Sequence, residues 1–198
     1  PISPLVSETL MQTMRQFFAQ TQAAKQAVSR DEENPWGYFD KELTKNRQDW
    51  KEIFDLGRDQ VGPYASKTPW PADIQDFQKV MLDWHQRCEA IAISLIKAIC
   101  SGLSNDPGTL IAAFRPRNSS FLRLNHYPIC TDPSDPGVDF PDQGHLGISH
   151  HTDAGALTIL LPDEVPGLQV RYCDHWHTID SGPGSLIVNV GDLVQVWS

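Results

Sequence analysis

Hydrophobic residues recur at helical spacing in two stretches of the first half of the chain. After Ser3-Pro4, a typical helix start, residues 4–28 carry apolar positions at steps of three and four, which predicts an amphipathic helix. A second apolar stripe begins at Ile74 and stops at Ser101-Gly102, and it predicts a helix of about 28 residues. No charged flank of the coiled-coil type accompanies this stripe, so we expect the second helix to pack against a sheet.

The period of the pattern changes to two after Phe114. Short strands are expected at 119–127, 145–151, 156–161, 168–172, 175–179 and 185–197. Strands of this kind, separated by Pro, Gly and Asp, indicate a sandwich or a jelly roll. We expect one domain, 1–198, with a mostly helical outer layer over 1–118 and a partial jelly-roll core with a metal site over 119–198.

Two segments lack a clear period. Residues 30–72 are interpreted as loops around short elements, forming a lid or an outer layer, on the turn signals Asn34-Pro35-Trp36-Gly37, Gly62-Pro63 and Trp70-Pro71. Residues 128–144 are rich in Pro, Asp and Gly, and they are interpreted as a loop over the mouth of a site.

Charge and composition narrow the class of partner. The net charge of −9, with no run of Lys or Arg, argues against a nucleic-acid partner, because a phosphate backbone would be repelled. No apolar stretch reaches membrane length, so no membrane association is expected and the protein is placed in the cytoplasm. The four Cys have no close pair, which favours reduced thiols.

The tripeptide His151-Thr152-Asp153 is the leading candidate for chemistry. On a strand, residues two apart project to the same face, so both side chains can reach one ion. An imidazole nitrogen and a carboxylate oxygen are two of the three ligands of the non-haem Fe(II) facial triad, and a zinc hydrolase with His/Asp/His ligands is an alternative. Because the chain has seven His, the tripeptide alone is weak evidence and its context has to decide.

Several blocks in fixed order give that context. The chain resembles the isopenicillin N synthase-like family of 2-oxoglutarate- and Fe(II)-dependent dioxygenases. The blocks that carry the resemblance are Trp70-Pro71, Arg123-Leu124-Asn125-His126-Tyr127-Pro128, Gly147-Ile148-Ser149-His150-His151-Thr152-Asp153, Pro166-Gly167-Leu168-Gln169-Val170-Arg171, Trp176, Pro183-Gly184-Ser185-Leu186-Ile187-Val188-Asn189-Val190-Gly191-Asp192 and Trp197.

The resemblance implies a fold and a ligand set. The fold would be a double-stranded β-helix, or jelly roll, with helices outside, mainly β and incomplete at both ends. His151 and Asp153 would bind Fe(II), and Asn125 and Tyr127 would lie beside the carboxylate of 2-oxoglutarate. Arg123 shares a face with Asn125 and Tyr127 by period two; it either meets an acidic group of the substrate or pairs with an acid at the surface.

The implied reaction is the oxidation of a small organic molecule by O₂, by hydroxylation, desaturation or cyclisation, while 2-oxoglutarate is decarboxylated to succinate. An iron oxidase of the same fold that does not use 2-oxoglutarate is one alternative. A non-catalytic jelly-roll binding domain is another.

The remaining His residues are expected outside the metal site. His150 should face away from His151, and His175 and His177 should face solvent because the intervening Trp176 matches a buried tryptophan of the family. His85 and His145 are expected to be solvated.

The chain departs from the family pattern in three places. The family's distal His ligand and the Arg-x-Ser that binds 2-oxoglutarate would follow Trp197-Ser198, and the family's first strand and helix would precede residue 1. His126 stands where an aromatic residue is commoner. We therefore expect a piece of a longer protein that, with two ligands only, binds iron weakly and exchanges it easily.

Overall fold

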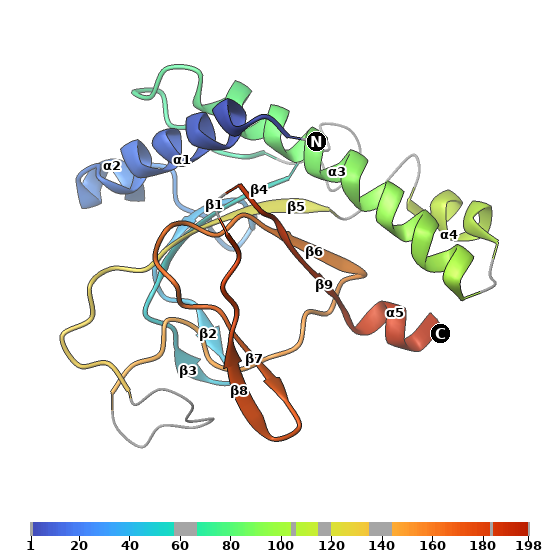
Figure 1. Ribbon diagram of the computed structural model, residues 1–198. Coiled ribbons are helices and arrows are strands. Elements are labelled where there is room, and N and C mark those ends of the chain that lie inside the picture. Colours follow the sequence, from blue (N-terminus) through green and yellow to red (C-terminus); the bar gives the residue numbers. More distant parts are fainter. Residues whose placement is uncertain are drawn as a thin grey trace. The chain divides into compact units, whose positions relative to one another are not determined.

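The computed structural model describes residues 2–57, 67–103, 106–114, 120–134, 144–182 and 184–197 (Figure 1). Contacts between residues divide the chain into two compact units. The first consists of Pro1–Asp40 and Glu52–His126, and the second of Lys41–Lys51 and Tyr127–Ser198.

The first unit contains four described helices. They are α1 (Pro4–Phe18), α2 (Gln22–Gln26), α3 (Phe77–Gly102) and α4 (Pro107–Phe114). The prediction of one helix over 4–28 was wrong in its middle, because the Thr21 hydroxyl accepts a hydrogen bond from the Ala24 amide and starts a new helix. The long second helix is confirmed, three residues shorter at its start.

The sheet of the first unit has the strand order β1 (Gly37–Phe39), β4 (Glu52–Gly57) and β5 (Phe121–His126), all antiparallel. β5 confirms the strand expected at 119–127. The interpretation of 30–72 as loops of an outer layer was wrong for β4, which is buried from Ile53 to Gly57. Because Asp55 is buried along with its apolar neighbours, β4 shows no period-two pattern that the sequence could reveal.

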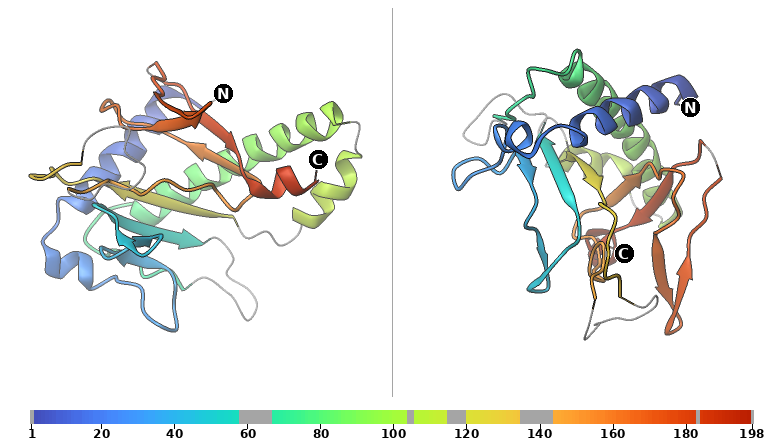
Figure 2. Two further views of the ribbon diagram at one scale, coloured as in Figure 1. Left: turned by 90° about the horizontal axis from the view of Figure 1, so that it is seen from below. Right: turned by 90° about the vertical axis from the view of Figure 1, so that its left-hand side faces the viewer.

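An aromatic cluster holds the helices to this sheet. Phe17 of α1 has no exposed surface, and its ring centroid lies 5.0 Å from that of Phe54 on β4 and 5.5 Å from that of Phe77 on α3. Both α1 and α3 lie on the same side of the sheet (Figures 1 and 2). Burial of these rings stabilises the contact between the two layers.

The described part of the second unit consists of strand pairs and a short helix. The pairs are β2 (Leu43–Thr44) with β3 (Arg47–Gln48), β6 (Leu157–Leu160) with β9 (Ile187–Val190), and β7 (Gln169–Tyr172) with β8 (His175–Thr178); the helix is α5 (Asp192–Trp197). Figure 1 shows β7 and β8 joined as a hairpin. The strands expected at 156–161, 168–172 and 175–179 are confirmed.

Two strand predictions in the second unit were wrong. Residues 145–151 form no strand, and only an isolated bridge joins His145 to Pro133. The strand expected at 185–197 ends at Val190, because the Asp192 amide turns to the Asp153 carbonyl at 2.8 Å and α5 begins there. Residues 135–143 of the expected loop 128–144 lie outside the described residues.

Burial settles several smaller expectations. His85 is buried in α3, contrary to the expectation that it is solvated, whereas His145, His175 and His177 are exposed as expected. All four Cys are free thiols, also as expected. Within the described ranges, none of the helices combines the length and apolar character needed to cross a bilayer.

Candidate metal centre

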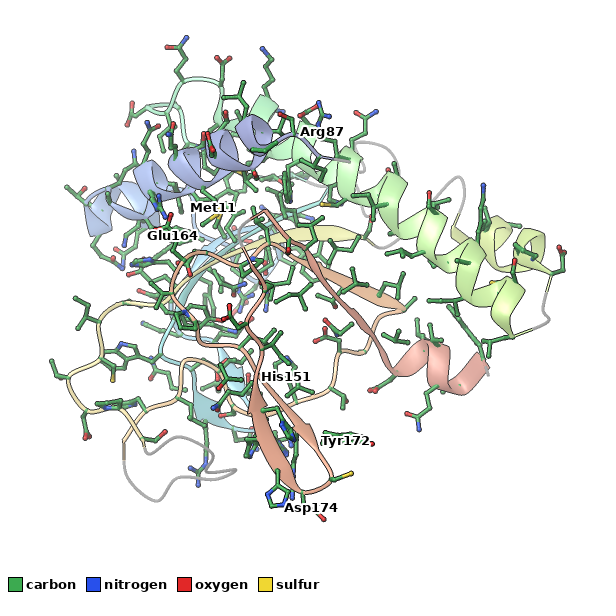
Figure 3. The ribbon with its side chains drawn as sticks, viewed as in Figure 1. Met11, Arg87, His151, Glu164, Tyr172 and Asp174 are labelled. Carbon is green, nitrogen blue, oxygen red and sulfur yellow. The ribbon has the colours of Figure 1, made fainter. Side chains whose placement is uncertain are left out.

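His151 and Asp153 converge within the second unit although their segment is not a strand. The His151 Nε2 atom lies 3.4 Å from the Asp153 Oδ1 atom, and 39% and 29% of the two side chains is exposed. Two donors that each bind an ion at about 2.1 Å can be up to about 4 Å apart, so a common point exists for these two. The pair therefore fits two neighbouring positions on a divalent ion. Figure 3 shows His151 and its surroundings.

A backbone contact orients the His151 ring. Its Nδ1 atom lies 2.9 Å from the carbonyl oxygen of Ser149. A neutral ring that carries its proton on Nδ1 donates to this carbonyl, and its Nε2 atom, 3.4 Å from Asp153 Oδ1, then carries the lone pair that an ion would bind. This arrangement is the one that a metal-binding imidazole needs.

Two donors hold the other oxygen of Asp153. The Thr158 hydroxyl donates to Oδ2 at 2.5 Å and the Asn189 amide donates to the same atom at 2.7 Å. Thr158 and Asn189 are directly opposite each other on β6 and β9, so their side chains share one face of the strand pair. Oδ1 is consequently the atom left to bind an ion.

The electrostatics of Asp153 favour the ionised form. Partial burial raises the pKa of this carboxyl, but the hydrogen bonds from Thr158 and Asn189 and the nearby His151 lower it by more. The net pKa lies below the ordinary value of an aspartate. Asp153 is thus a carboxylate at neutral pH, as a metal ligand must be.

The segment that carries both residues is fixed to the start of α5. The Gly191 amide donates to the Ala156 carbonyl at 2.9 Å, and the Thr152 hydroxyl donates to Asp192 at 2.9 Å. A Cβ atom on Gly191 would lie 2.1 Å from the Gly155 carbonyl oxygen, so only glycine allows this approach. The Gly191-Asp192 pair therefore shapes the loop that carries the two candidate ligands.

The other His residues near this segment make contacts that do not involve His151 or Asp153. His150 lies 2.8 Å from the Lys45 Nζ atom, and its ring centroid is 6.1 Å from that of Trp176. His175 and His177 are exposed on either side of Trp176 on β8. Among the residues that the structure describes, no third His, Cys, Asp or Glu completes a metal-binding group.

The residues expected to bind 2-oxoglutarate are divided between the units. Tyr127 is 51% exposed and lies against Gly147, where an added Cβ would meet its Cδ1 atom at 2.8 Å. This contact places the Tyr127 ring beside the segment that leads to His151. Asn125 lies on β5 in the first unit, opposite Ile53, and its role stays a prediction.

Arg123 is engaged within the first unit. Its guanidinium donates two hydrogen bonds of 2.7 Å to the buried carboxylate of Asp55. Arg123 was expected to meet either an acidic group of the substrate or an acid at the protein surface. In the structure it pairs with an acid of the protein, but this acid, Asp55, is buried. A contact between Arg123 and substrate stays an untested prediction.

Sequence reasoning missed the two residues that donate to Asp153, Thr158 and Asn189, and the contact between Asp49 and Ser149. Asn189 stands in a block that was noticed, but without a role. Thr158 is a polar residue among the apolar residues of β6, which is a usable signal in retrospect. Nothing in the local pattern around Asp49 connects it with a segment 100 residues away.

Comparison with family models matches the chain at both ends. Residues 118–198 match the 2OG-Fe(II) oxygenase superfamily, and residues 1–73 match the N-terminal region of the non-haem dioxygenases in morphine synthesis. The first match contains His151 and Asp153.

Curated relatives agree with these matches. Jasmonate-induced oxygenase 3 of Arabidopsis thaliana is 30% identical over 203 residues, covering 100% of this chain and 53% of the relative. Proline hydroxylase buaE of Petromyces alliaceus is 34% identical over 156 residues, covering 76% of this chain and 46% of the relative. The chain spans about half the length of the curated relatives it matches.

Solved structures show the same fold. A full-length Neurospora crassa protein in complex with alpha-KG matches with a TM-score of 0.82 at 27% identity, covering 100% of this chain and 63% of that one. JOX2 in complex with 2OG, Fe and JA matches with a TM-score of 0.82 at 28% identity, covering 98% and 56%. The predicted jelly roll with flanking helices is confirmed as the fold class. The chain belongs to the 2-oxoglutarate- and Fe(II)-dependent oxygenase superfamily.

Proposed function

We propose that this protein is an Fe(II)- and 2-oxoglutarate-dependent dioxygenase that oxidises a small organic molecule, with His151 and Asp153 as two of its iron ligands. The convergence of His151 Nε2 and Asp153 Oδ1 at 3.4 Å carries the proposal. Each side chain has its second polar atom engaged elsewhere, so Nε2 and Oδ1 are the two atoms that face each other and would bind the ion.

The chain's own residues prepare the centre. Iron, when bound with 2-oxoglutarate and O₂, supplies the oxidising chemistry, and a two-residue protein contribution leaves adjacent positions open on the ion. In this proposal the Tyr127 hydroxyl donates a hydrogen bond to the 2-oxoglutarate carboxylate, and Asn125 is a second candidate residue for that carboxylate. Arg123 is left out, because its guanidinium is bound to Asp55.

The relatives support a small-molecule substrate and the co-substrate. Solved structures of the Neurospora crassa protein contain alpha-KG with thymine or 5-formyluracil, and the JOX2 structure contains 2OG, Fe and JA. A curated relative is a proline hydroxylase. These ligands are small organic molecules of differing chemistry, which fits hydroxylation, desaturation or cyclisation as the outcome.

The compartment is part of the proposal. Four free thiols, one of them exposed, suit a reducing compartment, and we place the protein in the cytoplasm. The net charge of −9 argues against a nucleic-acid partner. Fractionation with labelled protein checks the compartment.

The decisive experiment measures O₂ consumed and succinate formed by the protein with Fe(II), 2-oxoglutarate and candidate substrates. We expect equal amounts of the two, lost in His151→Ala and Asp153→Ala and retained in His150→Ala, whose ring contacts Lys45 instead. O₂ consumption without succinate would instead indicate an iron oxidase, and turnover with zinc in anaerobic buffer would indicate a hydrolase. Failure to bind metal at all would leave a binding domain.

A further inference from the structure

A buried carboxylate far from the metal pair in sequence contacts the same segment. Asp49 is 2% exposed and follows the β2–β3 hairpin, within the second unit. Its Oδ1 atom accepts a hydrogen bond from the Ser149 amide at 3.1 Å. Ser149 is buried, and its carbonyl oxygen is the atom that lies 2.9 Å from His151 Nδ1.

Asp49 is itself held firmly. Its Oδ2 atom accepts a hydrogen bond from the Thr44 hydroxyl at 2.7 Å and lies 3.3 Å from the Lys51 Nζ atom. Lys51 is buried too, and its Nζ atom is 2.8 Å from Glu42 Oε2. One oxygen of Asp49 is thus used by its own hairpin, while the other reaches across to Ser149.

The neighbouring backbone adds to this contact. The Trp50 amide donates to the Leu146 carbonyl at 2.9 Å, so the two segments are joined at two points. Residues 146–153 belong to no strand, and a regular ladder does not fix them. The Asp49 side chain supplies an anchor where a strand partner is missing.

We infer that Asp49 is a positioning residue for the metal ligand His151. It fixes the Ser149 peptide, whose carbonyl sets the ring orientation and keeps the proton on Nδ1, so that Nε2 is free to bind the ion. Outer partners of this kind typically change metal affinity about 10- to 100-fold when removed. The inference rests on the proposed function, since it takes His151 as a ligand.

Two substitutions separate positioning from charge and from a merely structural role. Asp49→Asn keeps the length and an acceptor oxygen without the charge, whereas Asp49→Glu keeps the charge and displaces the carboxylate by one methylene. We expect Co(II) affinity, followed by the visible absorption of the ion, to stay within about 3-fold in Asp49→Asn and to fall at least about 10-fold in Asp49→Glu. Thr44→Val, which alters only the other oxygen's partners, is the matched control.

The opposite order, with the affinity lost in Asp49→Asn and kept in Asp49→Glu, would overturn positioning in favour of charge. Equal Co(II) affinity in both folded variants and the parent would refute the inference alone, whereas a parent that binds no Co(II) would refute the proposed metal centre. A second measurement needs no variant at Asp49. In ¹⁵N-labelled parent protein loaded with Zn(II), the His151 ring, assigned with His151→Gln, should bind the ion through Nε2 and carry its proton on Nδ1, and binding through Nδ1 would overturn the inference.

Discussion

Arg123 and Asp55 lie directly opposite each other on β5 and β4 and share two hydrogen bonds of 2.7 Å. Asp55 is 4% exposed, and Arg30 is a more distant cation at 3.9 Å. The Arg123 guanidinium therefore compensates the negative charge of Asp55, which lies on β4, the central strand of the first unit's sheet. Its bidentate geometry is one that Lys cannot reproduce.

Replacing Arg123 by Met should lower the free energy of unfolding by about 2 kcal/mol, because a buried carboxylate loses its main partner. Urea unfolding followed by circular dichroism measures this. Arg171→Met is the matched control, since Arg171 pairs with an exposed Asp174 and should change stability by less than about 0.5 kcal/mol. An equal small effect of both variants would mean that the Asp55 pair contributes no net stability.

This pair also shows where sequence reasoning stops. The α3 helix was predictable, because one face of it is apolar at helical spacing over its whole length. β4 was not, because every residue from Ile53 to Gly57 is buried and Asp55 is compensated by a residue distant in the chain. The residues next to Asp55 in the sequence do not indicate that Arg123 will pair with it.

The metal pair was predicted for a reason that is only half right. His151 and Asp153 were expected to converge because a strand would direct both to one face, but their segment is irregular. Convergence comes instead from Ser149, Thr158 and Asn189, which each bind one atom of the pair. Spacing singled out the two candidate ligands, while long-range contacts determine their geometry.

The donors to Asp153 can be tested separately from the ligand. Thr158→Val and Asn189→Ala should each weaken Co(II) binding about 10-fold or more, because Asp153 Oδ2 loses a partner and the carboxylate can rotate. Thr158→Ser keeps the hydroxyl and should bind nearly as the parent does. Thr178→Val, at an exposed position on β8, serves as the control. Unchanged affinity in both test variants would show that the carboxylate is held by other means.

Gly147 should be needed for the placement of Tyr127. An Ala side chain there would meet the Tyr127 ring at 2.8 Å, so the ring has to move. We expect Gly147→Ala and Tyr127→Phe each to weaken 2-oxoglutarate binding about 10-fold, as the loss of a hydrogen bond to a charged group does. Calorimetric titration with Mn(II) in place of iron measures this. Gly167→Ala adds a Cβ in open space and should have no effect on 2-oxoglutarate binding. A similar loss in Gly167→Ala would show that the effect of Gly147→Ala does not come from its contact with Tyr127.

The cysteines should differ sharply in reactivity. Burial raises the pKa of the Cys88 thiol to about 11, so at pH 8 only about one molecule in a thousand carries the reactive thiolate. Cys173 is exposed in the β7–β8 turn. A thiol-alkylating reagent at pH 8 should therefore modify Cys173 first and leave Cys88 intact until the protein is denatured, as peptide mass spectrometry would show. In Cys173→Ser the rapid modification should disappear, and rapid labelling of the half-buried Cys88 would contradict its raised pKa.

His126 should make the first unit sensitive to acid. Its ring stacks on Phe18 with centroids 5.1 Å apart, and desolvation lowers its pKa below the ordinary value, with Glu52 opposing this and Lys25 adding to it. In the unfolded chain the pKa is about 6.5, so as the pH falls below that value the unfolded state takes up the proton first. The free energy of unfolding therefore decreases from about pH 6.5 down to the lower pKa of the folded state and is unaffected above it.

Replacing His126 by Phe keeps a ring on Phe18 and removes the titration. The difference in unfolding free energy between this variant and the parent, measured by urea unfolding from about pH 7.5 to about pH 5, should be constant above about pH 6.5 and should shift in favour of the variant below it. A difference for His126→Phe that stays constant across the whole range would mean that the folded ring accepts its proton as readily as the unfolded one.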